Sequence, residues 1–344
     1  MSDMDKVRFG KTELLVSRIA LGALPLQRLD IPEAVELIHG ILDLGVNFID
    51  TANGYSDSEE KIGFALKDIP RDSVIITTKT TAQDKKTFMQ HVDLSLKRLG
   101  SEYIDIYQLH NVCSADDYRL RFGEGGAFEG LTEAIKAGKV RFPAFSSHNL
   151  PLAMDIMREG KFYAVQLPLN IIDDAAAKEA VPLAKELDMG FIAMKPLGGG
   201  MLTDVCLAFR YLSQFDNVVP DPGIEKLSEM EEIIGVIKSG QSFSATDVAA
   251  ADKLRKELSS HWCHRCDYCQ PCPQKININL ALTMESVIRR MPYHQVISFA
   301  GDNMVTARSC IQCGVCVERC PYKLKVPDLL KEKLALWDQY IKTK

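Results

Sequence analysis

Apolar residues in the first 240 positions of the chain follow two alternating patterns. Short apolar or β-branched runs alternate with longer segments in which apolar residues recur three or four positions apart. The short runs predict buried strands and the longer segments predict amphipathic helices, so their alternation indicates β-α units around a parallel sheet. The eight predicted strands cover residues 17–22, 45–50, 73–79, 103–110, 140–146, 162–167, 189–195 and 217–220.

The predicted helices separate these strands. Residues 32–45 and 84–100 each end in a glycine that suits a helix C-cap. Eight strands alternating with helices in this length predict an α/β fold with a closed (β/α)8 barrel of the TIM type, and an open doubly wound sheet is the alternative. A two-stranded hairpin is expected over residues 7–16, turning at Gly10 and Lys11, where it would plug the barrel floor.

The alternation of strand and helix patterns stops after about residue 240. A polar connector over residues 239–258 runs into a helix, and two cysteine-rich runs follow it. We therefore predict two domains, a barrel over residues 1–254 and a smaller cysteine-rich domain over residues 255–344.

Composition narrows the class of protein. The chain has 344 residues, of which 46% are hydrophobic and 25% are charged, as expected for a globular protein. No stretch approaches the roughly 18 apolar residues of a membrane span, and the start carries no apolar signal region, so a cytoplasmic protein is expected. The net charge of −5 shows no basic bias, which argues against nucleic acid as a partner.

Polar residues stand at the carboxyl ends of three predicted strands, where a barrel of this kind builds its active site. Asp50 ends the second strand and Tyr55 follows five residues later, while Lys79 and His110 end the third and fourth. This group suits carbonyl reduction, because the tyrosine hydroxyl can protonate the carbonyl oxygen while the lysine lowers the tyrosine pKa from about 10. The aspartate would hold the lysine and the histidine would orient the carbonyl. Taken singly, each residue has a plain structural alternative.

The segments "GVNFIDTANGYSDSEEKIGFAL", "VIITTKT" and "IDIYQLH" resemble the aldo-keto reductase family. The resemblance runs from residue 7 to residue 220 and implies a catalytic tetrad of Asp50, Tyr55, Lys79 and His110. It also implies a nicotinamide cofactor, NAD(P)H, across the barrel mouth and a small carbonyl or alcohol as substrate.

The same resemblance places further residues on that cofactor. "FSSHN" after strand five and Gln166 on strand six would grip the carboxamide, although the family more often has Ser-Asn where this chain has two serines. The segment "KPLGGG" would let the backbone approach a pyrophosphate, with a flexible turn as the alternative. The expected cofactor residues are Ser146, Ser147, Gln166, Lys195, Gly198, Gly199, Gly200 and Lys226.

The choice between NADH and NADPH depends on charge after strand eight. Asp221 and Glu225 would repel a 2′-phosphate and only Lys226 would attract it, so a preference for NADP is doubtful.

Cysteine spacing carries the second chemical signal. Eight of the ten cysteines lie between residues 263 and 320 in two runs, and each run ends in Cys-Pro. The second run matches the bacterial ferredoxin pattern, in which three thiolates wrap one [4Fe-4S] cluster and the fourth reaches another. The metal ligands expected on this pattern are Cys263, Cys266, Cys269 and Cys320 for one cluster and Cys310, Cys313, Cys316 and Cys272 for the other.

Two features of the runs leave alternatives open. The first run is one residue short before its last cysteine, which puts Cys272 in doubt as a ligand. Structural zinc is the alternative for the whole set, because paired C-x2-C motifs often bind it. A fused tail of this kind is similar to the ferredoxin-like domain that a subset of aldo-keto reductases carries, and a small, mainly helical domain is expected.

The two halves together suggest three functions. In the first, the barrel interconverts a carbonyl and an alcohol with NAD(P)H and the clusters are structural or sense redox state. In the second, the clusters exchange electrons with a ferredoxin or flavoprotein partner, which needs a converter between two-electron and one-electron chemistry. In the third, the barrel is a docking scaffold, and the intact tetrad argues against this.

Overall fold

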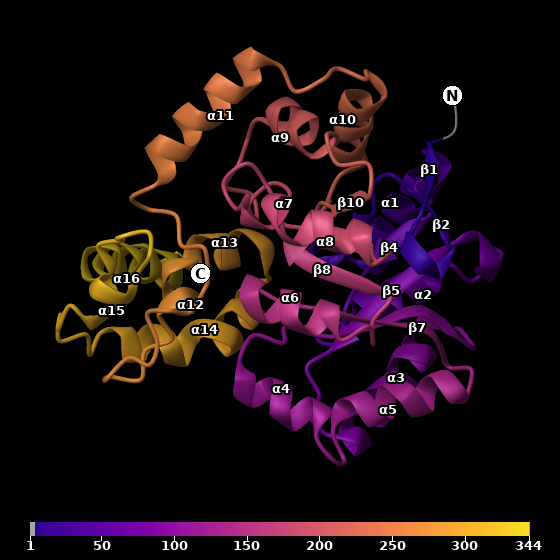
Figure 1. Cartoon of the computed structure of the whole chain (residues 1–344), viewed down its shortest axis with the longest axis horizontal. Helices are drawn as coiled ribbons and strands as arrows, with labels where there is room; N and C mark the ends of the chain where they lie inside the picture. The colour runs from indigo at the N-terminus through magenta and orange to yellow at the C-terminus, as the bar shows by residue number, and fades with distance from the viewer. Residues whose placement is uncertain (1–3, 344) are drawn as a thin grey trace. The chain divides into compact units, whose positions relative to one another are not determined.

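A computed structural model describes residues 4–343 of the chain. These residues form two compact units (Figure 1). One unit comprises the residues up to Leu197 together with Asp204–Phe243, and the other comprises Gly198–Thr203 together with the residues from Ser244 on. The short loop Gly198–Thr203, which interrupts the first unit in the sequence, is therefore grouped with the C-terminal unit.

Eight parallel strands form the centre of the first unit, and each pairs with its neighbour in sequence order. The ring closes between its first and last strands, because the amides of Ala20 and Gly22 donate to the carbonyls of Pro220 and Pro222, each at 2.9 Å. The closed (β/α)8 barrel is thus confirmed, and the open sheet was the wrong alternative. Its strands are β3 (Leu21–Gly22), β4 (Phe48–Asp50), β5 (Ile75–Thr80), β6 (Ile104–Leu109), β7 (Val140–Ser146), β8 (Ala164–Pro168), β9 (Gly190–Met194) and β10 (Val218–Asp221).

The N-terminal hairpin plugs the barrel floor as predicted. Strands β1 (Lys6–Arg8) and β2 (Leu15–Ser17) pair antiparallel. Between them, the fully buried ring of Phe9 packs edge-on against Phe48 inside the barrel, with ring centroids 5.3 Å apart. The predicted strand over residues 17–22 is therefore divided between this hairpin and β3.

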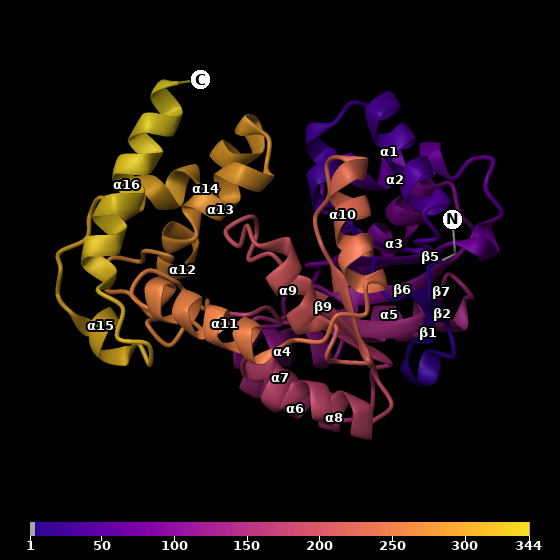
Figure 2. The same cartoon turned by 90° about the horizontal axis from the view of Figure 1, so that it is seen from above.

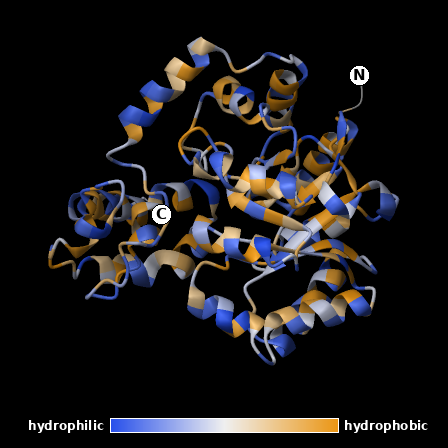
Figure 3. Ribbon diagram, in the orientation of Figure 1, coloured by the Kyte–Doolittle hydropathy of each residue, from blue (hydrophilic) through white to orange (hydrophobic). Residues whose placement is uncertain are grey.

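Helices surround the strands of this unit (Figure 2). Apolar and polar positions alternate around the helices, as Figure 3 shows, because each helix buries one face on the barrel. Their starts and ends follow local signals: Asp30 and Glu33 form a capping box at the start of α1, and Gly100 ends α3 in the left-handed conformation that its C-cap requires. They are α1 (Ile31–Asp43), α2 (Ser58–Ala65), α3 (Lys85–Leu99), α4 (Ala115–Phe122), α5 (Ala127–Lys136), α6 (Leu150–Arg158), α7 (Ala175–Lys178), α8 (Ala180–Glu186), α9 (Val205–Leu212) and α10 (Leu227–Lys238).

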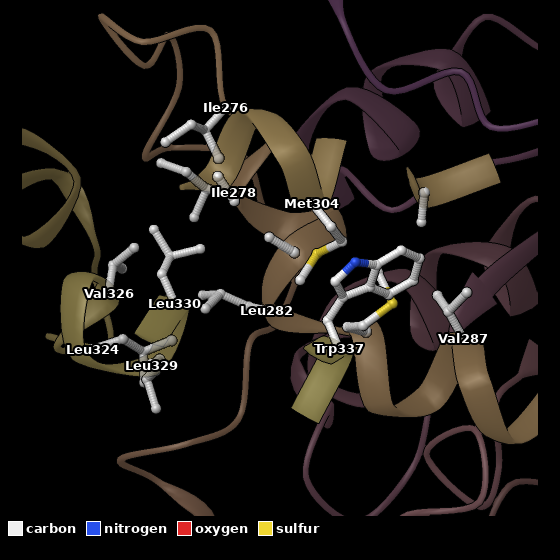
Figure 4. Packing of buried hydrophobic residues seen from close by; sticks show 14 of the residues in the cluster. Ile276, Ile278, Leu282, Val287, Met304, Leu324, Val326, Leu329, Leu330 and Trp337 are labelled. Atoms are coloured by element: carbon white, nitrogen blue, oxygen red, sulfur yellow. The ribbon is translucent and has the colours of Figure 1, made fainter. Parts of the chain in front are cut away.

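The C-terminal unit is helical in its described residues, as expected for the cysteine-rich domain. Its core gathers side chains from between the two cysteine runs and from beyond the second run, including Ile276, Leu282, Met304, Leu330 and Trp337 (Figure 4). The two runs are therefore held by one shared core. The helices are α11 (Ala245–Leu258), α12 (Ile278–Leu282), α13 (Met284–Arg290), α14 (Tyr293–Ala307), α15 (Val315–Arg319) and α16 (Val326–Lys342).

The two units divide the chain between Phe243 and Ser244, so the whole of α11 is grouped with the C-terminal unit. The domain boundary at 254/255 stays a prediction from the sequence. Among residues 4–343, no helix combines the length and the apolar character that a membrane crossing requires.

Candidate functional site

A buried ion pair lies at the carboxyl end of the barrel strands. The Lys79 Nζ atom is 2.5 Å from Asp50 Oδ2 and donates to the carbonyl of Thr51 at 2.8 Å. Both side chains are almost completely buried. Burial opposes the charge of Lys79, but the carboxylate of Asp50, with further contributions from Tyr55 and Asp221, holds the lysine pKa above its usual value.

Two aromatic side chains lie beside this pair. The Lys79 ammonium is 5.1 Å from the centre of the Tyr55 ring, and the rings of Tyr55 and His110 meet edge to face at 6.2 Å. Burial, together with the positive charges of Lys79 and Arg121, lowers the pKa of His110 to about 3. The structure thus brings the four residues of the predicted tetrad together and keeps the imidazole neutral at physiological pH.

Two buried glutamines join the strands around Asp50. Gln108 Nε2 donates to Thr77 Oγ1 at 2.9 Å and lies 3.3 Å from Asp50 Oδ1. Gln166 Nε2 donates to Asp50 Oδ2 at 3.1 Å and to Asp221 Oδ2 at 2.6 Å. The amide oxygens of both glutamines are buried and accept no hydrogen bond. The sequence identified Gln166 but missed Gln108, although Gln108 lies on strand β6 two residues before His110.

Asp221 occupies a different place from the one expected. Instead of facing a phosphate with Glu225, its carboxyl is buried beside Asp50, and burial together with the charge of Asp50 raises its pKa well above the usual range. Glu225 is ion-paired with Arg28, while Lys226 is exposed at the start of α10. The expected repulsion of a 2′-phosphate by Asp221 and Glu225 is therefore not supported. Asp221 belongs to the barrel site instead. The rule that found Asp50, a polar residue ending a barrel strand, also applies to Asp221.

Arg121 was another residue that sequence reasoning did not single out. It lies on α4, in the segment after β6, and is only 4% exposed. Its Nε atom donates to Asp117 at 2.8 Å, whereas its Nη1 atom is buried with no partner. Its charge is one reason why His110 stays neutral.

The two serines after β7 differ in their surroundings. The buried Ser146 hydroxyl accepts from the amide of Asn111 at 2.9 Å, which leaves its proton free to donate. Ser147 Oγ donates to the carbonyl of Val112 at 2.7 Å and accepts from the amide of Asn149 at 3.0 Å. Ser147 therefore stabilises the loop, and Ser146 is the better placed of the two to bind a ligand.

The glycine run after β9 is held by residues of its own compact unit. Gly198, Gly199 and Gly200 have φ values of +60°, +71° and +87°, a region that side chains disfavour. A Cβ on Gly198 would come within 2.4 Å of the Trp262 ring, and the hydroxyl of Ser286 donates to the Gly199 carbonyl at 3.2 Å. At the start of this segment, Lys195 Nζ lies 2.5 Å from His148 Nε2.

The cysteines of the C-terminal unit line two cavities. The larger, of about 400 Å³, is bordered by Cys272, Cys310, Cys313 and Cys316, together with Cys269. It has an apolar wall that includes Ile276, Ile278 and Leu330, and Cys313 is exposed at its edge.

The second cavity, of about 340 Å³, is bordered by Cys263, Cys266, Cys269 and Cys320. The two cavities thus divide the thiols into the two sets that the ferredoxin pattern predicts, with Cys269 reaching both. Cys113 and Cys206 line neither cavity.

The surroundings of the thiols suit side chains that bind a metal cluster. Burial raises the pKa of Cys269 to about 12 and also raises the pKa values of Cys266 and Cys316, so their thiolates need a compensating positive charge. A [4Fe-4S] cluster binds one thiolate at each of its four irons, which lie at alternate corners of a cube, so its ligands face a common cavity. Among residues 4–343, no three His, Cys, Asp or Glu side chains surround one point closely enough to hold a single metal ion.

Family models match both parts of the chain. Residues 18–207 match the aldo/keto reductase family, and residues 262–325 match the 4Fe-4S dicluster domain. The second match covers all eight cysteines of the two runs.

Individual relatives match the barrel region. The chain is 30% identical to aldo-keto reductase YhdN of Bacillus subtilis, over 58% of this chain and 64% of that protein. It is 28% identical to the NADH-specific methylglyoxal reductase of Escherichia coli, over 58% of this chain and 69% of that protein. The alignment with the Bacillus protein thus spans less than two thirds of its length.

Solved structures share the fold. The aldo-keto reductase AKR11C1 from Bacillus halodurans, in its holo form, superimposes with a TM-score of 0.64 at 22% identity, covering 73% of this chain and 96% of that one. An aldo/keto reductase from Klebsiella pneumoniae in complex with NADP and acetate gives a TM-score of 0.61 at 20% identity, covering 73% and 95%. With a family model that matches more than half of its residues, the chain belongs to the aldo/keto reductase family.

Proposed function

We propose that this protein interconverts a small carbonyl compound and its alcohol with NAD(P)H, and that its C-terminal unit holds two [4Fe-4S] clusters. The buried Asp50–Lys79 pair beside Tyr55 and His110 is the observation that carries the first part. Family membership supports it, as does the name of the E. coli relative, NADH-specific methylglyoxal reductase.

Each residue of the barrel site has a role that its surroundings allow. When bound, a reduced nicotinamide supplies a hydride to the carbonyl carbon. The Tyr55 hydroxyl donates its proton to the carbonyl oxygen, and the Lys79 ammonium, held by Asp50, stabilises negative charge on the tyrosine oxygen. His110 is neutral, so it donates a hydrogen bond to the carbonyl oxygen without adding charge. In the reverse direction, Tyr55 accepts the proton from the alcohol.

The residues present also fit a nicotinamide. The unpartnered amide oxygen of Gln166 is an acceptor suited to the NH2 group of the carboxamide, and the proton of Ser146 is available to its carbonyl. Lys195 would bind the pyrophosphate, with Lys226 toward the adenosine end. The assignment of Gly198, Gly199 and Gly200 to the pyrophosphate stays a prediction from the sequence.

Replacing Tyr55 with phenylalanine tests the reductase. We expect Tyr55→Phe to lower kcat for carbonyl reduction by about 10²- to 10⁴-fold, the usual contribution of a general acid, while NAD(P)H still binds. The measurement is steady-state oxidation of NADH and NADPH with methylglyoxal and other small aldehydes as probes.

The matched control is Tyr107→Phe. Tyr107 is a fully buried tyrosine on β6 whose hydroxyl lies 3.4 Å from Ser95, away from Lys79. The Tyr107→Phe variant should keep the carbonyl reductase activity of the wild type. Full activity of Tyr55→Phe would refute the assignment of the acid.

The two cavities and the dicluster match support the assignment of the clusters. One cluster would be bound by Cys263, Cys266, Cys269 and Cys320, and the other would be bound by Cys272, Cys310, Cys313 and Cys316. When bound, each cluster accepts or donates one electron.

Metal analysis of protein purified without oxygen tests this assignment. Two clusters give about eight irons and eight sulfides per chain, and Cys316→Ala should reduce both toward about four. Cys206→Ala is the control, because this exposed cysteine lies on α9, outside both cavities. Zinc without iron or acid-labile sulfide would contradict the assignment, and unchanged iron in Cys272→Ala would remove that residue from the ligand set.

A second candidate function is electron exchange between the clusters and an acidic carrier protein such as a ferredoxin or flavoprotein. Basic residues outnumber acidic ones in residues 244–344, whereas acidic residues dominate residues 1–243 and give the chain its net charge of −5. Cys313 and its neighbour Ile311, at the edge of the larger cavity, are exposed. Lysine and arginine side chains near an accessible cluster attract an acidic partner.

A further inference from the structure

The amide group of Gln166 is held between two carboxyl groups. Its nitrogen lies 2.6 Å from Asp221 Oδ2 and 3.1 Å from Asp50 Oδ2. A side-chain amide has two N–H donors, so these contacts use both. Gln166, Asp50 and Asp221 are all more than nine-tenths buried, so water does not replace either partner.

This arrangement fixes which way the amide points. Turning the group over would place its oxygen against two carboxyl groups and lose both hydrogen bonds. The Gln166 oxygen is therefore held away from the carboxyl groups, where it is buried with no partner. An unsatisfied buried acceptor of this kind is ready to bind a donor from a ligand.

We propose that Asp221 is a positioning residue for the nicotinamide, because it holds the Gln166 amide so that its oxygen accepts a hydrogen bond from the NH2 group of the cofactor carboxamide. The inference rests on the nicotinamide-dependent activity proposed above. It assigns Asp221, a residue outside the tetrad, to the same site.

Asp221 is the stronger of the two holders. Asp50 also accepts from Lys79 at 2.5 Å and from Gln108 at 3.3 Å, so its oxygens are shared among several donors. Asp221 Oδ2 makes the shorter bond to Gln166, and its other oxygen has no partner. Loss of Asp221 would leave one donor of Gln166 unpaired and the amide free to rotate.

A fixed amide has a consequence for the reaction. The carboxamide orients the nicotinamide ring, and the ring orientation decides which of the two hydrogens at its reacting carbon is transferred. Asp221 therefore contributes to the affinity for the cofactor and to the stereospecificity of hydride transfer. Replacing a residue with a purely structural role would not change the stereospecificity of hydride transfer.

The test compares cofactor binding in Asp221→Ala and Asp221→Asn with the wild type, by fluorescence titration of the full chain with NADH and NADPH. We expect Asp221→Ala to bind about tenfold more weakly, as for the loss of one hydrogen bond. Asp221→Asn should retain most of the affinity, because its amide oxygen still accepts from Gln166. Asp221→Leu is a second variant without an acceptor, in case the alanine variant does not fold.

Thr77→Ala is the matched control. It removes a buried hydrogen bond of 2.9 Å from Gln108, the other glutamine at Asp50, and leaves Gln166 untouched. It should bind the cofactor like the wild type. Transfer from cofactor deuterated on one face should be fully stereospecific in the wild type, Thr77→Ala and Asp221→Asn, and mixed in Asp221→Ala.

A double-mutant cycle with Gln166→Ala completes the test. If Asp221 acts through Gln166, the double variant binds no more weakly than Gln166→Ala alone. Two outcomes would overturn the inference while the proposed function stands. One is a double variant whose loss of cofactor affinity equals the product of the two single losses. The other is wild-type affinity with full stereospecificity in both Asp221→Ala and Asp221→Leu. Failure of the wild type to bind either nucleotide would overturn the proposed function itself.

Discussion

Charge at the barrel mouth is carried by three side chains that water does not reach. Asp50, Lys79 and Asp221 lie within one hydrogen-bonded group, and each is at most 8% exposed. Burial, together with the charge of Asp50, raises the pKa of Asp221 well above its usual range, so the ion pair of Asp50 and Lys79 has a second carboxyl group beside it.

The lowered pKa of His110 gives a prediction for stability. A histidine titrates near pH 6.5 in an unfolded chain but near pH 3 in this fold, so between these values the unfolded chain binds one more proton. His110 therefore makes the free energy of unfolding fall as the pH falls from 6.5 toward 3, by up to about 1.4 kcal/mol per pH unit. The variant His110→Gln should lose this part of the pH dependence.

Urea unfolding followed by circular dichroism at a series of pH values, without oxygen, measures the difference between the two proteins. His294→Gln is the control, because this histidine is exposed on α14. Equal pH dependence of the wild type and His110→Gln would show that the imidazole is not held neutral.

At the scale of elements, the strand pattern was predictable because each barrel strand is buried by its neighbours and helices. All residues of β5 and β6 are buried, and most of their positions are apolar, β-branched or aromatic, with Lys79, Asp105 and Gln108 as the exceptions. Strand ends then placed Asp50, Lys79 and His110 on one edge, since parallel strands all end at the same face. Cysteine spacing likewise predicted the division of the thiols between two cavities.

Contacts between residues that are far apart in the sequence were not predictable. Gln166 and Asp221 are 55 positions apart and meet because β10 pairs with β9 and β9 with β8, with Asp221 opposite Met194. The ion pair between Arg28 and Glu225 joins segments at the start and end of the barrel in the same way. No local pattern signals such pairs, so Asp221 was assigned from the sequence to the wrong surroundings.

At the scale of the whole molecule, the sign of the charge changes near residue 244. Within the basic C-terminal unit, Lys275 is exposed next to Gln274, which lines the larger cavity, and Lys331 lies 3.5 Å from Gln312, another lining residue. These two lysines place positive charge beside residues that line that cavity.

If the clusters exchange electrons with an acidic carrier, the rate should depend on salt. We expect electron transfer from the reduced protein to an acidic ferredoxin to slow by about tenfold or more as ionic strength rises, because salt screens the attraction that steers the encounter. Lys275→Glu and Lys331→Glu should slow it at low salt. Stopped-flow absorbance of the ferredoxin measures the rate.

Lys256→Glu is the charge-matched control on α11, away from the cavity linings, and should have the smaller effect. A rate that is independent of salt, or faster transfer to a basic carrier, would argue against this partner.

The loop Gly198–Thr203 has a consequence for how the gene can change. If a reductase and an iron-sulfur protein were simply joined end to end, each would be encoded by its own continuous stretch of the gene. Here the loop precedes α9 and yet packs with residues encoded beyond position 244. A side chain at Gly198 would collide with Trp262, and the Gly199 carbonyl depends on Ser286. A gene fragment that stops before residue 244 would encode the loop without these partners. We expect descendants of this sequence to alter the two stretches together or to conserve both.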